Sequence, residues 1–216
     1  MAYQEHLRLL LGGTEDWNAW RRDTPPSAPD LSGADLSKRD LSGVDLSRAG
    51  LNNASFFQAD LRAANLYRAN LFGANLCQAN LEGANLEGAD LSSANFSETK
   101  LRGAKLSHAI LNEADFSGRD FSGMDLSGAS LFQANLDEVD FSGANLEEAS
   151  FSEANLHLAN LLGANVRGAN FLNAKLQEAY LKETDLREAK LNGADLREAF
   201  LSTKQKLVFW YRSRRQ

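Results

Sequence analysis

The chain has 216 residues, 43% of them apolar, which is enough for one core, and its 29 acidic against 23 basic residues give a net charge of −6. An acidic chain does not attract nucleic acid through its phosphates, so we expect no direct nucleic-acid partner. Without an apolar run long enough to span a membrane, and without a signal-peptide pattern at its start, the sequence predicts a cytoplasmic protein with no membrane partner.

The N-terminal segment, 1–29, predicts a short helix, a second helical turn and a linker. An amphipathic pattern covers residues 2–11 and ends at two glycines, which stop helices. Its apolar side carries Leu7, Leu10 and Leu11. Three prolines in 24–29 fix φ and exclude helix, so we expect a stiff linker there.

Two tryptophans distinguish the second helical turn, residues 15–20. Thr14 supplies an N-cap for this turn. Trp17 and Trp20 lie three residues apart and therefore share one face of the helix. We expect both rings to cap the structure that follows the linker. The alternative is that they contact a partner protein or a second copy of the chain.

Residues 30–201 repeat a five-residue unit without a slip of register. Every fifth residue from Leu31 to Leu201 is Leu or Phe, apart from Val166, and a small residue, usually Ala, lies two positions before it. Asp or Asn commonly lies between the two, as in Ala74-Asn75-Leu76. Residues two apart face the same way in a strand, whereas the step from each Leu to the next small residue is three. The chain must therefore turn a corner in every unit if both are to lie inside.

Right-angled corners would close one coil in four units, or twenty residues. The phenylalanines support this period, because like side chains in successive coils stack. Three pairs of them lie twenty apart: Phe96 and Phe116, Phe121 and Phe141, Phe151 and Phe171. The sequence thus predicts a solenoid whose coils pair as parallel strands about 4.8 Å apart.

The unit A(D/N)LXX resembles that of the pentapeptide-repeat protein family, and the resemblance covers most of the chain. It implies an all-β solenoid, a right-handed quadrilateral β-helix with about 20 residues per coil. We therefore expect three parts: a helical cap and Pro-rich linker at 1–29, the β-helix at 30–201, and a capping tail, helical, basic and aromatic, at 202–216.

Some residues depart from the repeat pattern. Arg39 and Arg119 occupy the inward position of the small residue, where a guanidinium cannot lie unpaired among leucines. We expect the coil to bulge there so that each guanidinium reaches an Asp, and an anion-binding site is the alternative. Phe72, Phe132 and Leu172 share one outward column, which is either a set of ordinary surface residues or a docking strip.

The tail after the last repeat combines aromatic and basic residues. It contains Leu207, Phe209, Trp210 and Tyr211 among five basic residues, without an acid. The last coil has no successor to cover its edge, and such an edge recruits strands from other molecules. We therefore expect Phe209 and Trp210 to cap the last coil, within a monomer or across a homodimer.

The repeats carry no pattern typical of catalysis. The Asp residues before each Leu are expected to bond to corner amides, as short Asx side chains do, rather than act as acids or bases. No nucleophile pattern, phosphate loop or metal-ligand spacing is present, so we expect no enzymatic activity, no cofactor and no metal. The single cysteine, Cys77, agrees with a reducing compartment.

The main functional hypothesis is a scaffold that binds a protein partner of unknown identity. The alternative comes from the family resemblance, because some pentapeptide-repeat proteins mimic DNA and bind DNA gyrase, a topoisomerase. The acidic balance and a column of four glutamates support mimicry, whereas Lys and Arg residues interrupt the negative field. The column consists of Glu98, Glu138, Glu178 and Glu198.

Overall fold

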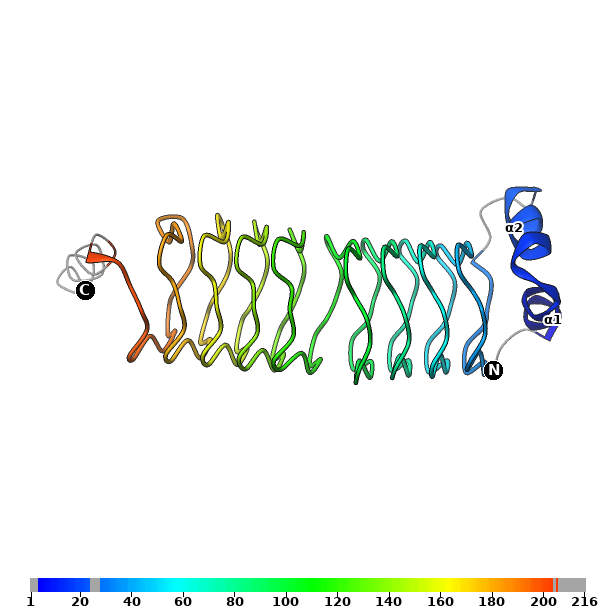
Figure 1. Cartoon of the computed structure of the whole chain (residues 1–216), viewed down its shortest axis with the longest axis horizontal. Helices are drawn as coiled ribbons and strands as arrows, with labels where there is room; N and C mark the ends of the chain where they lie inside the picture. The colour runs from blue at the N-terminus through cyan, green and yellow to red at the C-terminus, as the bar shows by residue number, and fades with distance from the viewer. Residues whose placement is uncertain (1–3, 24–27, 204, 206–216) are drawn as a thin grey trace. The chain divides into compact units, whose positions relative to one another are not determined.

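The chain divides into two compact units, Met1–Asp115 and Phe116–Gln216. The computed structural model describes residues 4–23, 28–203 and 205 (Figure 1). The first unit begins with α1 (Gln4–Gly12) and α2 (Thr14–Asp23) and continues as stacked coils, and the second unit consists of further coils. The predicted tail contacts of Phe209 and Trp210 lie outside the described residues.

The two helices differ slightly from the sequence prediction. Helix α1 ends at Gly12, and Gly13 then adopts a φ of 141°, which favours glycine. Leu10 is buried, whereas Leu11, which the sequence places on the same side of the helix, is 43% exposed. Helix α2 runs to Asp23, longer than the 15–20 predicted.

Each unit is a right-handed quadrilateral β-helix. Its backbone pairs are single parallel bridges, and each bridge joins residues twenty apart, from Asp30↔Gly50 to Asp90↔Ile110 in the first unit and from Asp120↔Asp140 to Tyr180↔Phe200 in the second. This spacing confirms the predicted period. Pro29 already belongs to the first coil, because its carbonyl accepts a hydrogen bond from the N–H of Gly50 at 2.9 Å.

A four-residue turn makes the regular corner of the coils. In the first, the N–H of Ala34 donates to the carbonyl of Leu31 at 3.0 Å, and Gly33 has a φ of 68°. The third residue of the turn needs positive φ, which glycine adopts without steric cost. The Asx residue before each Leu supports the same corner, as predicted: Asp30 Oδ1 accepts from the N–H of Ser32 at 2.9 Å.

The inward Leu, Phe and Ala side chains form the core of each unit. Phe121 and Phe141 stack with ring centroids 5.6 Å apart, and Phe151 and Phe171 stack at 5.1 Å. These contacts confirm two of the three predicted pairs. The third pair, Phe96 and Phe116, is divided between the two units and stays a prediction.

Two threonines replace alanine inside the coils without leaving a polar group unsatisfied. Thr99 is 4% exposed and donates its hydroxyl to the carbonyl of Leu76 at 2.8 Å. Thr184 is 3% exposed and donates in the same way to Leu161 at 2.6 Å. The carbonyl belongs in both cases to a Leu 23 residues earlier. A buried hydroxyl is thus tolerated because the neighbouring coil offers an acceptor.

The final coil is less well buried than its sequence predicts. Leu191, Leu196 and Leu201 are half-buried, although the repeat pattern places all three inside. The repeats end here, so these side chains are packed by a coil on one side only. The regular turn is also replaced by bends at residues 187–189.

We expect Leu126→Ala to lower the free energy of unfolding by about 2 to 5 kcal/mol, because the removed side chain is fully buried and leaves a cavity. Urea unfolding followed by circular dichroism measures this change. Ser127→Ala, at the adjacent corner, is the control and should leave stability almost unchanged. A loss below about 0.5 kcal/mol for Leu126→Ala would contradict the burial of this column.

Candidate interaction surfaces

Backbone groups of each coil are satisfied by its neighbours along the stack. The N–H of Asn65 donates to the carbonyl of Val44, and the carbonyl of Asn65 accepts from the N–H of Leu46, both at 2.8 Å. The carbonyl of Tyr67 accepts from the N–H of Arg48 in the same way. The first coil starts the stack, so the corresponding groups of Asp45 and Ser47 need partners from elsewhere.

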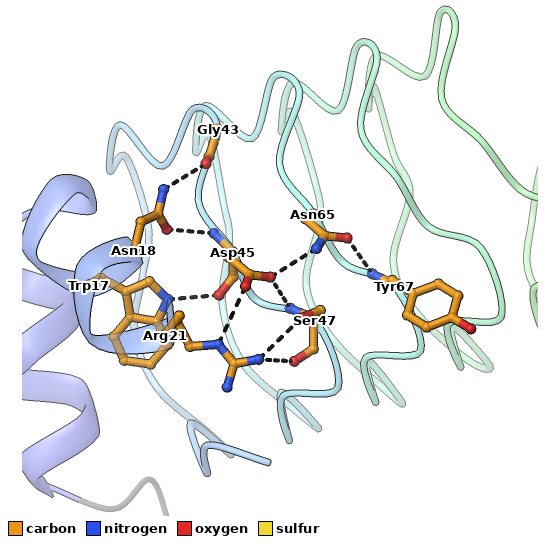
Figure 2. Close-up of polar contacts among 8 residues, drawn as sticks. All are labelled: Trp17, Asn18, Arg21, Gly43, Asp45, Ser47, Asn65 and Tyr67. Atoms are coloured by element: carbon orange, nitrogen blue, oxygen red, sulfur yellow. Dashed lines mark hydrogen bonds and ion pairs between the residues drawn. The ribbon is translucent and has the colours of Figure 1, made fainter. Parts of the chain in front are cut away.

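Three side chains of α2 supply these partners (Figure 2). Asn18 Oδ1 accepts from the N–H of Asp45 at 2.8 Å. Trp17 Nε1 donates to the carbonyl of Asp45 at 2.8 Å, and Arg21 Nη2 donates to the carbonyl of Ser47 at 2.8 Å. Helix α2 therefore replaces the missing coil at this face, using residues that lie on one side of a helix.

Further contacts fix the helix on the coil. Asn18 Nδ2 donates to the carbonyl of Gly43 at 3.0 Å, so both ends of this amide are used. Trp17 is fully buried, and its ring centroid lies 5.0 Å from that of Trp20. Arg21 Nε lies 3.6 Å from Asp45 Oδ2, and the side chain of Arg21 is only 8% exposed. An ion pair this well covered orients the guanidinium toward Ser47.

Helix α1 contributes to a second face of the first coil. His6 Nδ1 accepts from the N–H of Asp30 at 3.1 Å, and the His6 ring centroid lies 5.3 Å from that of Trp20. Both helices thus provide side-chain partners for the starting edge. These contacts are made within one chain.

A side-chain amide plays the same part at the other end of the second unit. Gln205 Nε2 donates to the carbonyls of Leu181 and Thr184, each at 2.7 Å. In earlier coils a carbonyl at the position of Thr184 accepts from a backbone N–H, as Ala144 accepts from Asn165 at 2.9 Å. Gln205 therefore donates to the carbonyl of Thr184 from its side-chain amide, where the earlier coil uses a backbone N–H.

Four exposed apolar side chains group together on the second unit. We call them the Tyr180–Phe200 patch: Leu158 is 40% exposed, Leu162 36%, Tyr180 37% and Phe200 47%. The rings of Tyr180 and Phe200 lie 5.1 Å apart. Leu158 and Leu162 flank Asn160, which is bridged to Tyr180 on the next coil. The patch therefore spans three successive coils of one face.

The predicted outward strip is less continuous than this patch. Phe72 and Leu172 are exposed by 48% and 42%, but Phe132 is half-buried. Ser152 occupies the column between Phe132 and Leu172, so the two apolar residues lie about two coil spacings apart. A docking role for these residues stays a prediction.

Sequence reasoning missed the Tyr180–Phe200 patch, although a signal was present. Both aromatic residues replace the Asp or Asn that precedes each Leu, and they lie twenty residues apart. Two such replacements in one column place two rings side by side. The same position holds an exposed apolar residue in the first unit, Ile110, at 37%.

The two arginines that the repeat pattern places inward keep the backbone hydrogen bonds of their turns. The N–H of Arg39 donates to the carbonyl of Leu36 at 3.4 Å, and that of Arg119 donates to Phe116 at 3.1 Å. Arg39 is exposed, whereas Arg119 is half-buried. The pKa of Asp35 lies below its ordinary value mainly because Ser37 donates to it, with a smaller effect from the charge of Arg39. The anion-site alternative stays a prediction.

A shallow groove of about 420 Å³ surrounds His157 on the second unit. His157 Nδ1 lies 2.7 Å from Asp137 Oδ1, and Nε2 lies 3.7 Å from Glu178 Oε1. The hydrogen bond to Asp137 raises the pKa of His157, and the charges of Asp137 and Glu178 act in the same direction. Lys175 and Arg197 line the same groove, so its charge is mixed.

Among residues 4–23, 28–203 and 205, no three His, Cys, Asp or Glu side chains are grouped so as to hold a metal ion. Neither helix in this part of the chain has the length and apolar character needed to cross a membrane. Cys77 is a free, half-buried thiol.

Comparison with protein families matches the coils to pentapeptide repeats. Eight copies are found, over residues 30–68, 69–107, 109–141, 134–171 and 169–202. The chain belongs to the pentapeptide-repeat family. The family model begins and ends with the coils, so the helices before residue 30 and the residues after 202 are features of this pentapeptide-repeat protein outside the repeat itself.

Solved structures similar to this pentapeptide-repeat protein include HetL from the cyanobacterium Nostoc sp. strain PCC 7120, with 29% identity, a TM-score of 0.51, and coverage of 93% of this chain and 97% of HetL. A second pentapeptide repeat protein from Nostoc, alr5209, shares 39% identity over 45% of this chain and 75% of its own, with a TM-score of 0.39. Full-length QnrB1, a plasmid-mediated fluoroquinolone resistance protein, shares 19% identity over 83% of this chain and 99% of its own, with a TM-score of 0.29. Among curated protein sequences, none matches this chain significantly.

We expect Asn18→Ala to lower the free energy of unfolding by about 1 to 2 kcal/mol, because the N–H of Asp45 and the carbonyl of Gly43 lose their partner together. Urea unfolding followed by circular dichroism tests this. Arg22→Ala, on the exposed side of α2, is the control. Equal stability of the two variants would show that the starting edge does not need the amide.

The contribution of His157 to stability should depend on pH. Because the folded pKa is raised above 6.5, the protonated ring stabilises the fold below that pH, and this contribution is lost as the pH rises through the folded pKa. His157→Asn should therefore destabilise the protein more at about pH 6 than at about pH 9, as measured by urea unfolding. His108→Asn, an exposed corner histidine, is the control. A pH-independent difference would contradict the pairing with Asp137.

Proposed function

We propose that this protein is a non-enzymatic, cytoplasmic scaffold that binds a partner protein through the Tyr180–Phe200 patch. The observation that carries the proposal is the grouping of exposed Leu158, Leu162, Tyr180 and Phe200 on three successive coils. Exposed apolar side chains grouped on one face in this way mark interaction sites on soluble proteins, whereas single exposed residues do not.

The residues of the patch are of the type that contributes most to protein binding. Tyr is enriched among the residues that dominate interface energies, and aromatic rings are enriched at interface centres generally. Lys182 Nζ lies 5.3 Å from the ring centroid of Tyr180, which places a cation at the border of the patch. An apolar centre with a charged border supports a protein partner.

The scaffold also presents this patch in a fixed geometry. The N–H of Phe200 donates to the carbonyl of Ala179 at 2.9 Å, and the N–H of Leu181 donates to the carbonyl of Phe200 at 3.1 Å. The backbone below both rings is therefore held on each side of Tyr180. Little main-chain entropy is lost when a partner binds to such a surface, so its apolar contacts contribute more fully to affinity.

The similarity to HetL supports a regulatory role. HetL is described as a pentapeptide repeat protein involved in heterocyst differentiation regulation. By analogy, we propose that this chain acts in a regulatory process by binding a protein rather than by catalysis.

The paired charges of the surface give less support to DNA mimicry. Arg62 contacts Asp60 at 2.5 Å, and Arg167 contacts Glu147 at 2.6 Å. The side chain and N–H of Arg197 donate to Asp195 and lower the pKa of this carboxyl to about 2. Acids that carry their own arginine partners contribute weakly to the extended negative field that a DNA mimic requires. Gyrase binding therefore remains the alternative hypothesis.

We expect the full-length variant Tyr180→Asn/Phe200→Asn to lose partner binding, because it replaces both rings by the residue common at this position of the repeat. Affinity capture from lysate of the native organism, with quantitative mass spectrometry, measures the loss. Proteins enriched by the wild type should fall at least about tenfold with the double variant, since hot-spot residues contribute about 2 kcal/mol each.

Ile110→Asn is the matched control, because Ile110 has the same repeat position and the same 37% exposure as Tyr180 but belongs to the first unit. Ile110→Asn should capture the same proteins, in the same amounts, as the wild type. An unchanged set of captured proteins for the double variant would show that the partner binds elsewhere.

A further inference from the structure

We propose that the C-terminal segment 206–215 of this chain docks on the Tyr180–Phe200 patch and thereby competes with the partner protein. The competition rests on the proposed function, whereas the docking itself does not. The segment reads Lys-Leu-Val-Phe-Trp-Tyr-Arg-Ser-Arg-Arg, an apolar block followed by basic residues.

The position of Gln205 brings the segment to the patch. The carbonyl of Leu181 accepts from Gln205 Nε2 at 2.7 Å, and the N–H of Leu181 donates to the carbonyl of Phe200 at 3.1 Å. Leu181, adjacent to Tyr180, thus contacts both Gln205, the residue that precedes the segment, and Phe200 of the patch. The segment leaves the described structure beside the surface that we propose it covers.

The length of the segment suffices for this contact. An extended chain advances at most about 3.3 to 3.6 Å per residue, so Phe209 and Trp210, four and five residues after Gln205, reach up to about 13 to 18 Å. The patch spans three successive coils, or about 10 Å between the first and the third at the strand spacing. The aromatic residues of the segment can therefore meet every coil of the patch.

The chemistry of the segment complements that of the surface. Its apolar block matches the four apolar side chains of the patch. The border of the patch carries three acids, Glu178, Glu183 and Glu198, beside the single cation Lys182 that lies over the Tyr180 ring. The four cations of the segment, Lys206, Arg212, Arg214 and Arg215, complement this acidic excess. Opposite charges around an apolar centre fix the register of a bound peptide. A segment of this composition fits the patch better than an acidic peptide would.

Tryptic cleavage of the full chain after Lys206 tests the docking, because a docked segment is protected. The initial rate, followed by mass spectrometry, should rise about tenfold in Tyr180→Asn/Phe200→Asn, which corresponds to a loss of about 1.4 kcal/mol of docking free energy. Ile110→Asn is the control and should cleave at the wild-type rate. Equal rates in the wild type and the double variant would overturn the proposal, whatever the capture experiment finds.

A labelled synthetic peptide of residues 206–215 provides the second measurement. Full-length Phe209→Ser/Trp210→Ser leaves the patch uncovered, so fluorescence anisotropy should show the peptide binding about tenfold tighter to this variant than to the wild type. When Tyr180→Asn/Phe200→Asn is combined with Phe209→Ser/Trp210→Ser in one chain, binding of the labelled peptide should be abolished. Equal binding with and without the patch rings would refute docking at this surface. Protection that disappears on dilution, with dimers in light scattering, would overturn docking within one chain and assign the contact to a second copy.

Discussion

The hydrogen bonds between successive coils are the constraint on which this structure depends. A five-residue unit has too few backbone contacts of its own to form a sheet, and its corner closes only one bond, such as that between Ala34 and Leu31. The other N–H and C=O groups need a coil twenty residues away. Each coil is therefore stable only between two neighbours, and the ends of the stack become the places where the repeat must be replaced by something else.

The replacements at the two ends follow one chemical principle. A side-chain amide carries the same donor and acceptor as a peptide group, so it can take the place of a missing strand. Asn18 uses both groups of its amide on the starting edge, and Gln205 uses its amide nitrogen on the carbonyls of Leu181 and Thr184. Trp17 and Arg21 add donors to the starting edge. A helix or a short terminal segment can thus end a β-helix without forming a strand.

The uniform interior leaves the outward positions free to vary, and this separates stability from function. Leu, Phe and Ala fill the core in every coil, whereas the Asx and corner positions need only bond to the turn or adopt positive φ. Most residues at the Asx position are polar, and their side chains bond to the corner amide. Tyr180 and Phe200 give the corner no advantage over Asn. Their exposure has a cost in water and no benefit to the coil, which is why we assign the binding role to them.

The sequence alone determined the fold and most of the core, because a strict period of five constrains the direction of every side chain. It also determined the stacking of Phe121 on Phe141, since coil register follows directly from the period. Only the tertiary structure decided how the ends are capped. The hydrogen bond between Asn18 and Asp45 joins a helix outside the repeats to the first coil, and no periodic pattern in the sequence indicates such a contact. The tertiary structure likewise decided that Leu158 and Leu162 group with Tyr180 and Phe200, because residues on different columns become neighbours only when the coils are wound on one another.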